Sequence, residues 1–393
     1  MTAAADAPPP QAAEALAERF AASAAERDER GGTPKAERDA LRESGLLALA
    51  IPTAFGGLGA RWSETLAAVR IFARADSSIA HVFGFHHLML ATVRLFGQPA
   101  QWQPWYEQTA RKQWFWGNAL NPLDTRTVVR QAGPLWYEFS GKKSFCSGAL
   151  DSEMLVASAV DEAAGGRLRI AALPTARSGI VLHEDWDNFG QRQTDSGSVG
   201  FERVRVEHHE LLLDPGPLGT PFASLRPLIA QLVLCHTFLG IAEGSFDEAR
   251  HYTRAEARPW FKSRADHITA DPYVLSHYGE FYTGLEGARL LVERAAALLD
   301  AAWDTGPSLG DAQRGALAVA IAAAKVAATR IGLELSSRLF EVTGARATHA
   351  ALRLDRHWRN LRTQSLHDPL DYKLAELGDW ALNGAVPAPT FYS

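Results

Sequence analysis

Residues 317–339 read LAVAIAAAKVAATRIGLELSSRL, an apolar stretch whose large side chains recur at helical spacing. Leu317, Ile321, Leu335 and Leu339 fall on one stripe of such a helix, and a similar stripe runs through residues 275–299. Long helices with one apolar stripe bury it by packing side by side in antiparallel bundles. Residues 222–393 are therefore predicted to form a C-terminal four-helix bundle.

The pattern changes between residues 114 and 221. Short apolar runs that partly alternate, such as residues 136–139, 168–173 and 199–206, are separated by glycines and other turn residues. Short alternating runs bounded by turn residues are typical of strands, and we expect a middle antiparallel β domain here.

Residues 11–113 return to helical spacing, with Leu16, Phe20 and Ala24 on one stripe. They are predicted to form an N-terminal helical domain, and the Ala- and Pro-rich residues 1–10 a disordered tip. The expected fold class is α+β, mainly α.

Composition narrows the range of functions. The net charge of the 393 residues is −5, so the chain offers no basic field for nucleic acid. No stretch approaches about 18 uninterrupted apolar residues, and the N-terminus lacks the pattern of a secretory signal. The two cysteines, Cys146 and Cys235, are far apart and do not have metal-ligand spacing. We expect a cytoplasmic protein without a metal, a membrane span or a disulfide framework.

Three segments of the β domain combine small polar residues with an aromatic: residues 116–119, 143–149 and 185–198. That combination suits a planar ligand with apolar faces and polar edges. Near the C-terminus, Ser365-Leu366-His367-Asp368-Pro369 sets an imidazole beside a carboxylate at a helix end, where general acid/base chemistry can be built.

Five motifs, taken together, resemble those of the acyl-CoA dehydrogenase superfamily, in the flavin-dependent monooxygenase branch typified by dibenzothiophene monooxygenase. They lie at residues 145–148 (FCSG), 192–197 (RQTDSG), 257–260 (ARPW), 340–346 (FEVTGAR) and 365–369 (SLHDP). The resemblance covers nearly the whole chain and implies the three-part fold described above.

The resemblance also implies a flavin site in the β domain. Asn118 and Ser147 match polar contacts to the flavin ring, and Phe145 and Trp186 match aromatic walls of the pocket. Ser196 matches a hydroxyl on the ribityl or phosphate side of the cofactor.

Two further segments are implied to bind the cofactor. Arg258 matches a ligand of the flavin phosphate, for which a forked guanidinium is well suited. Gly344 and Arg346 match a loop that reaches the cofactor of a neighbouring subunit. The resemblance therefore implies an oligomer, namely a homotetramer built as a dimer of dimers.

Four residues are implied to be catalytic: His367, Asp368, Ser147 and His86. We expect His367, tuned by Asp368, to act with Ser147 as a set of hydrogen-bond donors, and His86 to be preferred over its neighbour His87. The family pattern has a histidine where Gln364 stands here. Gln364 can donate a hydrogen bond but cannot titrate, so a proton relay through that position is lost.

The implied activity is that of a two-component monooxygenase. FMN would arrive as FMNH2 from a separate NADH-dependent flavin reductase, because no dinucleotide-binding fingerprint occurs in a strand-turn-helix context. With O2 it would form a C4a-hydroperoxyflavin that oxygenates a small apolar organosulfur or aromatic substrate. Dibenzothiophene, oxidised to its sulfoxide and sulfone, is the reference substrate.

Other activities remain open at this stage. Related enzymes of the same branch hydroxylate nitrogen or carbon. An FAD-dependent acyl-CoA dehydrogenase would need a glutamate base, but none lies between Arg359 and Pro369. The third alternative is a flavin-binding protein that has lost catalysis.

Overall fold

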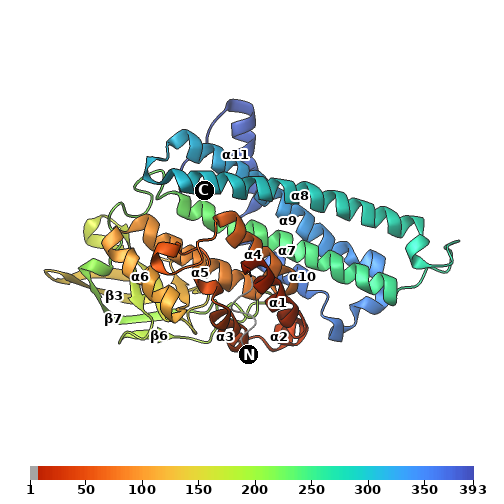
Figure 1. The fold of residues 1–393 in the computed structure, drawn as a ribbon, viewed down its shortest axis with the longest axis horizontal. Helices are drawn as coiled ribbons and strands as arrows, with labels where there is room; N and C mark the ends of the chain where they lie inside the picture. Colours follow the sequence, from red (N-terminus) through yellow and green to blue (C-terminus); the bar gives the residue numbers. More distant parts are fainter. Residues whose placement is uncertain (1–7) are drawn as a thin grey trace.

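The computed structural model describes residues 8–393, so most of the predicted disordered tip, residues 1–7, lies outside the described residues. Helices make up most of the structure, with one sheet at an end of the long C-terminal helices (Figure 1). The N-terminal helices are α1 (Pro9–Ala21), α2 (Ala24–Arg30), α3 (Lys35–Ser44), α4 (Trp62–Ala75), α5 (Ser77–Phe96) and α6 (Pro99–Lys112).

Helix α5 carries residues of the site, and its start is fixed by a side-chain cap. The Asp76 carboxylate accepts hydrogen bonds from the backbone N–H groups of Ser78 and Ile79, which would otherwise lack partners. The buried Arg27 also donates to Asp76, over 2.5 Å. Nearly all of α5 is buried, because it lies between α4, α7 and β1.

The sheet comprises β1 (Trp116–Ala119), β2 (Val128–Gly133), β3 (Trp136–Lys143), β4 (Met154–Asp161), β5 (Arg167–Pro174), β6 (Ile180–Leu182) and β7 (Val199–Glu207). Its order is β1-β4-β2-β3-β7-β6, and β5 pairs with the other edge of β4. Two pairs, β1 with β4 and β2 with β4, are parallel.

The prediction of an antiparallel β domain is therefore wrong for these two pairs, and the sheet is mixed. Between β1 and β4 the chain forms the β2–β3 hairpin and a loop. A connection of this length lets β4 return in the same direction as β1. The parallel pairing places Asn118 opposite Val156, on the edge strand β1 that packs against α5.

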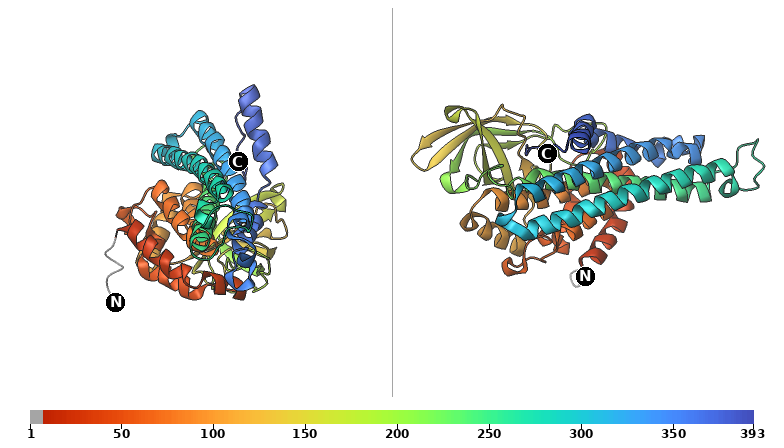
Figure 2. Two further views of the ribbon diagram at one scale, coloured as in Figure 1. Left: turned by 90° about the vertical axis from the view of Figure 1, so that its right-hand side faces the viewer. Right: turned by 90° about the horizontal axis from the view of Figure 1, so that it is seen from above.

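The C-terminal helices are α7 (Leu225–Ala255), α8 (Pro272–Thr305), α9 (Asp311–Thr343), α10 (Arg356–Ser365) and α11 (Leu370–Asn383). Helices α7, α8 and α9 run alongside one another, and the shorter α10 packs against α7 and α9 as the fourth helix of the bundle (Figure 2). Because α4 and α5 also pack against α7, the N-terminal and C-terminal helices share one hydrophobic core. A second, smaller core lies within the sheet.

Three helices, α5, α7 and α9, are long and apolar enough by composition to cross a membrane. Their most apolar segments are 94%, 100% and 67% buried inside the protein, respectively. These helices therefore form the core of the fold, and protein surrounds most of their apolar surface.

The helical core also contains histidines with neutral rings. Burial lowers the pKa values of His81, His86 and His236 to about 3, and that of His87 well below its usual value. An unfolded histidine has a pKa of about 6.5, so between pH 6.5 and pH 3 only the unfolded chain binds these protons. The free energy of unfolding must therefore fall as the pH is lowered through this window.

We expect the urea midpoint of unfolding to be clearly lower at pH 5 than at pH 7, since each such histidine costs about 2 kcal/mol at pH 5. His236→Leu should reduce this loss by about that amount, because neither ring nitrogen of His236 has a hydrogen-bond partner within residues 8–393. Identical pH dependence in wild type and His236→Leu would contradict this explanation.

Candidate active site

A pocket with a volume of about 490 Å³ opens where the sheet meets the helices, a size typical of small-ligand and cofactor sites. Its wall combines α5, the ends of the strands, the first turns of α7, the α10–α11 connection and residues near the C-terminus. The lining residues used below are His81, Phe85, Asn118, Phe145, Ser147, Trp186, Gln191, Thr194, Ser196, Arg226, Gln231, Gln364, His367 and Tyr392.

Six residues predicted from the sequence meet in this pocket. Asn118 lies on β1, while Phe145 and Ser147 follow β3. Trp186 and Ser196 lie between β6 and β7. His367 reaches the pocket from the connection between α10 and α11.

A chain of hydroxyl groups starts at Ser147. Its Oγ lies 2.8 Å from Ser196 Oγ, which lies 2.7 Å from Thr194 Oγ1. Thr194 is also 3.0 Å from the backbone oxygen of Gln191. Each hydroxyl can donate one hydrogen bond and accept two, so the chain can point its protons in either direction. Because the Gln191 carbonyl can only accept, Thr194 donates to it, Ser196 donates to Thr194 and Ser147 donates to Ser196. If Thr194 turns its proton to Ser196 instead, the order reverses and the Ser147 hydroxyl is left to donate into the pocket.

His81 holds the other side of Ser147, with Nε2 3.0 Å from Ser147 Oγ. Gln191 Nε2 donates to Gln364 Oε1 over 3.1 Å, which orients the Gln364 amide so that its Nε2 donates to His81 Nδ1. The proton of the neutral His81 ring is then on Nε2, directed at Ser147. Burial, with a smaller contribution from His367, lowers the pKa of His81 to about 3, so the ring stays neutral at physiological pH.

The structure places His86 outside the pocket, contrary to the prediction that it is one of the active-site histidines. His86 Nε2 lies 2.7 Å from the Leu47 backbone oxygen, and Nδ1 accepts the Trp116 backbone N–H over 3.1 Å. Both ring nitrogens are thus used to join the helices to the start of the sheet. Residues five apart on a helix point about 140° away from each other. Because His86 faces the start of the sheet, the same helix directs His81 into the pocket. The useful signal was the spacing of His81 and Phe85, whose ring centroids lie 4.1 Å apart with the ring planes tilted by 36°.

Asp368, which the sequence predicts to tune His367, acts on it through its charge and forms no hydrogen bond with the His367 ring in the described residues 8–393. The Asp368 carboxylate accepts hydrogen bonds from Lys325, over 2.8 Å, and from Gln231, over 3.0 Å. The His367 ring instead packs against Tyr392. Burial lowers the pKa of His367 to about 4, and the positive charge of Lys325 contributes to this shift. The negative charge of Asp368 opposes it.

More than a third of the His367 side chain is accessible from the pocket, so water there screens part of this effect. The direction agrees with that of His81, and we take both rings as neutral near pH 7. His367 can then accept or donate one hydrogen bond, but it is not a stored proton source.

Strained backbone surrounds the pocket. Phe145, Gln191 and Asp195 have φ values of 59°, 54° and 50°, a region that residues other than glycine seldom adopt. Such strain persists only where surrounding contacts hold it, and it is often found at functional sites. Here it turns the Phe145 ring toward the pocket, where its centroid lies 6.0 Å from the Trp186 ring and 58% of the residue remains exposed.

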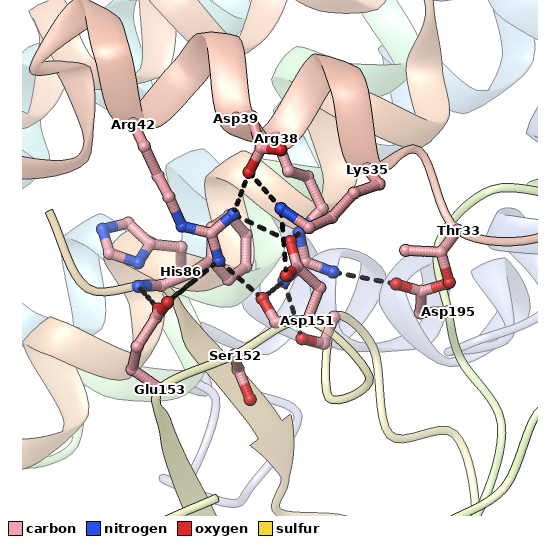
Figure 3. Close-up of polar contacts among 12 residues, drawn as sticks. Thr33, Lys35, Arg38, Asp39, Arg42, His86, Asp151, Ser152, Glu153 and Asp195 are labelled. Atoms are coloured by element: carbon pink, nitrogen blue, oxygen red, sulfur yellow. Dashed lines mark hydrogen bonds and ion pairs between the residues drawn. The ribbon is translucent and has the colours of Figure 1, made fainter.

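A buried cluster around Arg38, on α3, supplies the contacts that hold these loops (Figure 3). Arg38 donates to Asp195 Oδ2 over 2.8 Å and to the backbone oxygen of Gly148 over 2.9 Å. Thr33 donates to the other oxygen of Asp195 over 2.7 Å. One guanidinium therefore joins the loop that bears Ser147 to the loop that bears Ser196.

Three predicted cofactor residues lie elsewhere in this chain. Arg258 is in the loop between α7 and α8, and Gly344 and Arg346 follow α9. All three are exposed, and both segments are at the end of the bundle away from the sheet (Figures 1 and 2). The structure does not bring them to this chain's own pocket, so their role toward a neighbouring subunit stays a prediction.

Two features of the pocket suit the FMN ring. Asn118 accepts a hydrogen bond from the backbone N–H of Leu120 through its Oδ1, while within residues 8–393 its Nδ2 has no hydrogen-bond partner. The exposed face of Phe145, beside Trp186, offers an apolar surface for a planar ring. A donor at the rim and an aromatic wall are what a flavin requires.

Four residues of the lining were not predicted from the sequence: His81, Gln191, Arg226 and Tyr392. For Arg226 a signal was present, because it is the one charged residue in the first 17 positions of α7. A single charged residue in an otherwise apolar helix indicates either a buried polar contact or a ligand-binding site.

Two family models match the chain. "Acyl-CoA dehydrogenase, N-terminal domain" matches residues 10–113, and "Acyl-CoA dehydrogenase, C-terminal domain" matches residues 232–372. The probable FMNH2-dependent monooxygenase SfnC of Pseudomonas putida is 72% identical over 378 residues, which are 96% of this chain and 95% of SfnC.

Two groups of solved structures are also similar. Methanesulfinate monooxygenase MsuC from Pseudomonas fluorescens has a TM-score of 0.98 and 74% identity, covering 98% of this chain and 100% of that one. FMN-bound TdsC from Paenibacillus sp. A11-2, a dibenzothiophene monooxygenase, has a TM-score of 0.94 and 42% identity, covering 98% and 100%. The resemblance, the fold and the FMN cofactor expected from the sequence are thereby confirmed.

Proposed function

The chain belongs to the acyl-CoA dehydrogenase superfamily, in its branch of FMNH2-dependent monooxygenases, and from this premise we propose that it oxygenates the sulfur atom of a small organosulfur compound. The substrate class we favour is the short alkanesulfinates. MsuC, the relative at 74% identity, is a methanesulfinate monooxygenase, whereas the dibenzothiophene monooxygenases share about 42% of their residues with this chain. Dibenzothiophene, the reference substrate expected from the sequence, becomes the second choice.

The proposed reaction is R–SO2⁻ + O2 + FMNH2 → R–SO3⁻ + FMN + H2O. One oxygen atom forms a new bond to sulfur and the other leaves as water, while FMNH2 supplies two electrons and two protons. Reduced FMN, when bound, activates O2 toward the electron-rich sulfur. A neutral thioether would follow the same stoichiometry and give a sulfoxide.

The protein's part is to bind, to orient and to exclude water. Asn118 and Ser196 would hold polar edges of the flavin, and Phe145 and Trp186 would pack against its apolar parts. A largely apolar pocket keeps water away from a reactive oxygen species and strengthens each hydrogen bond within it.

The His81–Ser147 pair is proposed to position the proton that accompanies oxygen transfer. His81 donates through Nε2 to Ser147 Oγ, so the Ser147 proton can be directed into the pocket. Ser196 would replace that proton when Thr194 turns its own proton from the Gln191 oxygen to Ser196. Proton movement between hydroxyls in hydrogen-bond contact needs no charged histidine, which agrees with the lowered pKa values of His81 and His367.

We also propose the homotetramer expected from the sequence. Thr253 Oγ1 lies 3.2 Å from the Val342 backbone oxygen, so the segments carrying Arg258 and Arg346 emerge close together at the far end of the bundle. Large apolar side chains are exposed nearby, including Trp260 at 69% and Phe261 at 77%. Exposed apolar groups beside two arginines suit a surface that completes the phosphate end of a neighbour's flavin site.

A separate flavin reductase is the implied source of FMNH2. The use of NADH by this reductase is part of the proposal. So is a cytoplasmic location, which agrees with two buried, unpaired cysteines.

A substrate panel tests the proposal. Purified protein, a flavin reductase, NADH, FMN and O2 are mixed with methanesulfinate, dibenzothiophene, a primary amine, a phenol or an acyl-CoA. We expect methanesulfonate from methanesulfinate with the highest kcat/KM, and a requirement for FMN. Oxygenation confined to the amine or the phenol would overturn the assignment to sulfur. Reduction of bound flavin by the acyl-CoA without O2 would instead indicate a dehydrogenase.

A further inference from the structure

Arg226 is a buried arginine that points into the pocket and has no acidic partner within residues 8–393. It is 5% exposed and lines the pocket from the first turn of α7. Its Nε lies 3.4 Å from Thr92 Oγ1, and within residues 8–393 the other N–H groups of the guanidinium have no hydrogen-bond partner. Burial is the main cause lowering the pKa of Arg226 to about 10, opposed only by the Tyr392 phenol.

The other buried arginines in residues 8–393 have acidic groups around them. Arg27 pairs with Asp76 over 2.5 Å and Arg38 with Asp195 over 2.8 Å. Arg356 pairs with Glu248, and Arg314 is influenced by Glu376 and Asp311. In the part of the chain that the structure describes, no carboxylate is among the charges that act on Arg226.

An uncompensated buried charge destabilises the fold, so its presence needs another reason. The neighbouring groups do not supply one. Asp368 is bound by Lys325 and Gln231, the His367 ring is neutral, and Tyr392 has a pKa raised by burial and so stays uncharged near pH 7. The pocket therefore holds a positive charge that an anionic ligand would neutralise.

We propose that Arg226 is the anion-binding residue of the substrate site and that it receives the sulfinate group of the substrate. This inference rests on the proposed function and narrows it to anionic organosulfur compounds. The forked guanidinium matches the two oxygens of a sulfinate, as it matches those of a carboxylate. Two parallel hydrogen bonds would fix both oxygens and leave the sulfur lone pair directed away from Arg226, toward the rest of the pocket.

The same arrangement selects against neutral substrates. A neutral thioether such as dibenzothiophene would leave the guanidinium buried without a partner. Removing the charge should therefore weaken binding of anions and leave neutral thioethers unaffected or better bound.

The test compares wild type with Arg226→Met, Arg226→Lys and the control Arg130→Gln, which removes one exposed positive charge from β2. Binding of ethanesulfonate, an unreactive anion, is measured by calorimetry on the full chain without flavin. Arg226→Met should weaken it about 30-fold or more, Arg226→Lys less, and Arg130→Gln not at all. The KM for methanesulfinate should rise in the same order, while the KM for dibenzothiophene does not rise.

Two further measurements separate the alternatives. The Tm of Arg226→Met should equal or exceed that of wild type, because a buried charge without a partner is removed; a lower Tm would show a structural role instead. FMN affinity should be unchanged, and its loss with unaltered ethanesulfonate binding would assign Arg226 to the flavin and overturn the proposal. If Arg226→Met does not fold, equal KM changes for the anionic and neutral substrates in Arg226→Lys overturn it as well. Calorimetry does not depend on turnover, so absence of any oxygenated product would count against the proposed function alone.

Discussion

Replacing Ser147 by alanine is expected to lower the rate of substrate oxygenation by about 100- to 1,000-fold, the loss typical when one preorganised hydrogen-bond donor is removed from an active site. Ser147 is the hydroxyl at which the His81 ring and the Ser196–Thr194 chain meet. Without it, the chain of proton donors ends before the pocket. Single-turnover product formation with prereduced FMN measures the effect without the reductase.

Ser152→Ala is the matched control, because Ser152 is in the same region but bonds to Ala149 and Thr175 outside the pocket. It should retain nearly full activity. The Ser147→Ala protein should consume FMNH2 and O2 while releasing more hydrogen peroxide. Wild-type rates of product formation in Ser147→Ala would show that the hydroxyl chain has no part in catalysis.

Arg38→Met is expected to lower the free energy of unfolding by about 3–5 kcal/mol, because it leaves the Asp195 carboxylate buried without its charged partner. Asp195 is 3% exposed and Arg38 fully buried. Urea unfolding measures this loss. The comparison variant is Arg42→Met, on the same helix as Arg38. It removes a partly exposed guanidinium that binds Asp151, and it should lower the free energy of unfolding by only about 1 kcal/mol.

A double variant tests the cause. Arg38→Met combined with Asp195→Asn removes both charges and should be more stable than Arg38→Met alone, because no unpaired carboxylate remains. Since Arg38 also holds the Gly148 backbone, both variants should bind FMN more weakly than wild type. A stability loss as small as that of Arg42→Met would contradict the role given to this cluster.

Local patterns were sufficient to predict most of the fold. The apolar stripe in residues 317–339 lies within α9, and the short alternating runs between residues 114 and 221 are strands, as expected. The direction in which strands pair was not accessible from such patterns. The parallel partners β1 and β4 are separated by a hairpin, and pairing over that distance depends on the packing of the whole sheet.

The site was predicted less completely, because it too depends on how distant parts of the chain pack together. Motifs identified Asn118, Ser147 and Ser196 because each lies beside a recognisable sequence pattern. The choice between His81 and His86 depends on which face of α5 meets the pocket, and a shift of five residues changes that face.

Arg226 shows the limit most clearly. Its place in an apolar helix was visible in the sequence, but the absence of a carboxylate around it is a property of the folded chain. A residue whose role depends on a missing partner can be recognised only when its surroundings are known.

The central claim is that this pocket transfers one atom of O2 to substrate sulfur. Wild-type protein is mixed with one equivalent of reduced FMN and methanesulfinate under oxygen-18 gas, and the product is analysed by mass spectrometry. We expect methanesulfonate carrying a single oxygen-18 atom. Recovery of unlabelled methanesulfinate, with all of the label in hydrogen peroxide or water, would contradict the account.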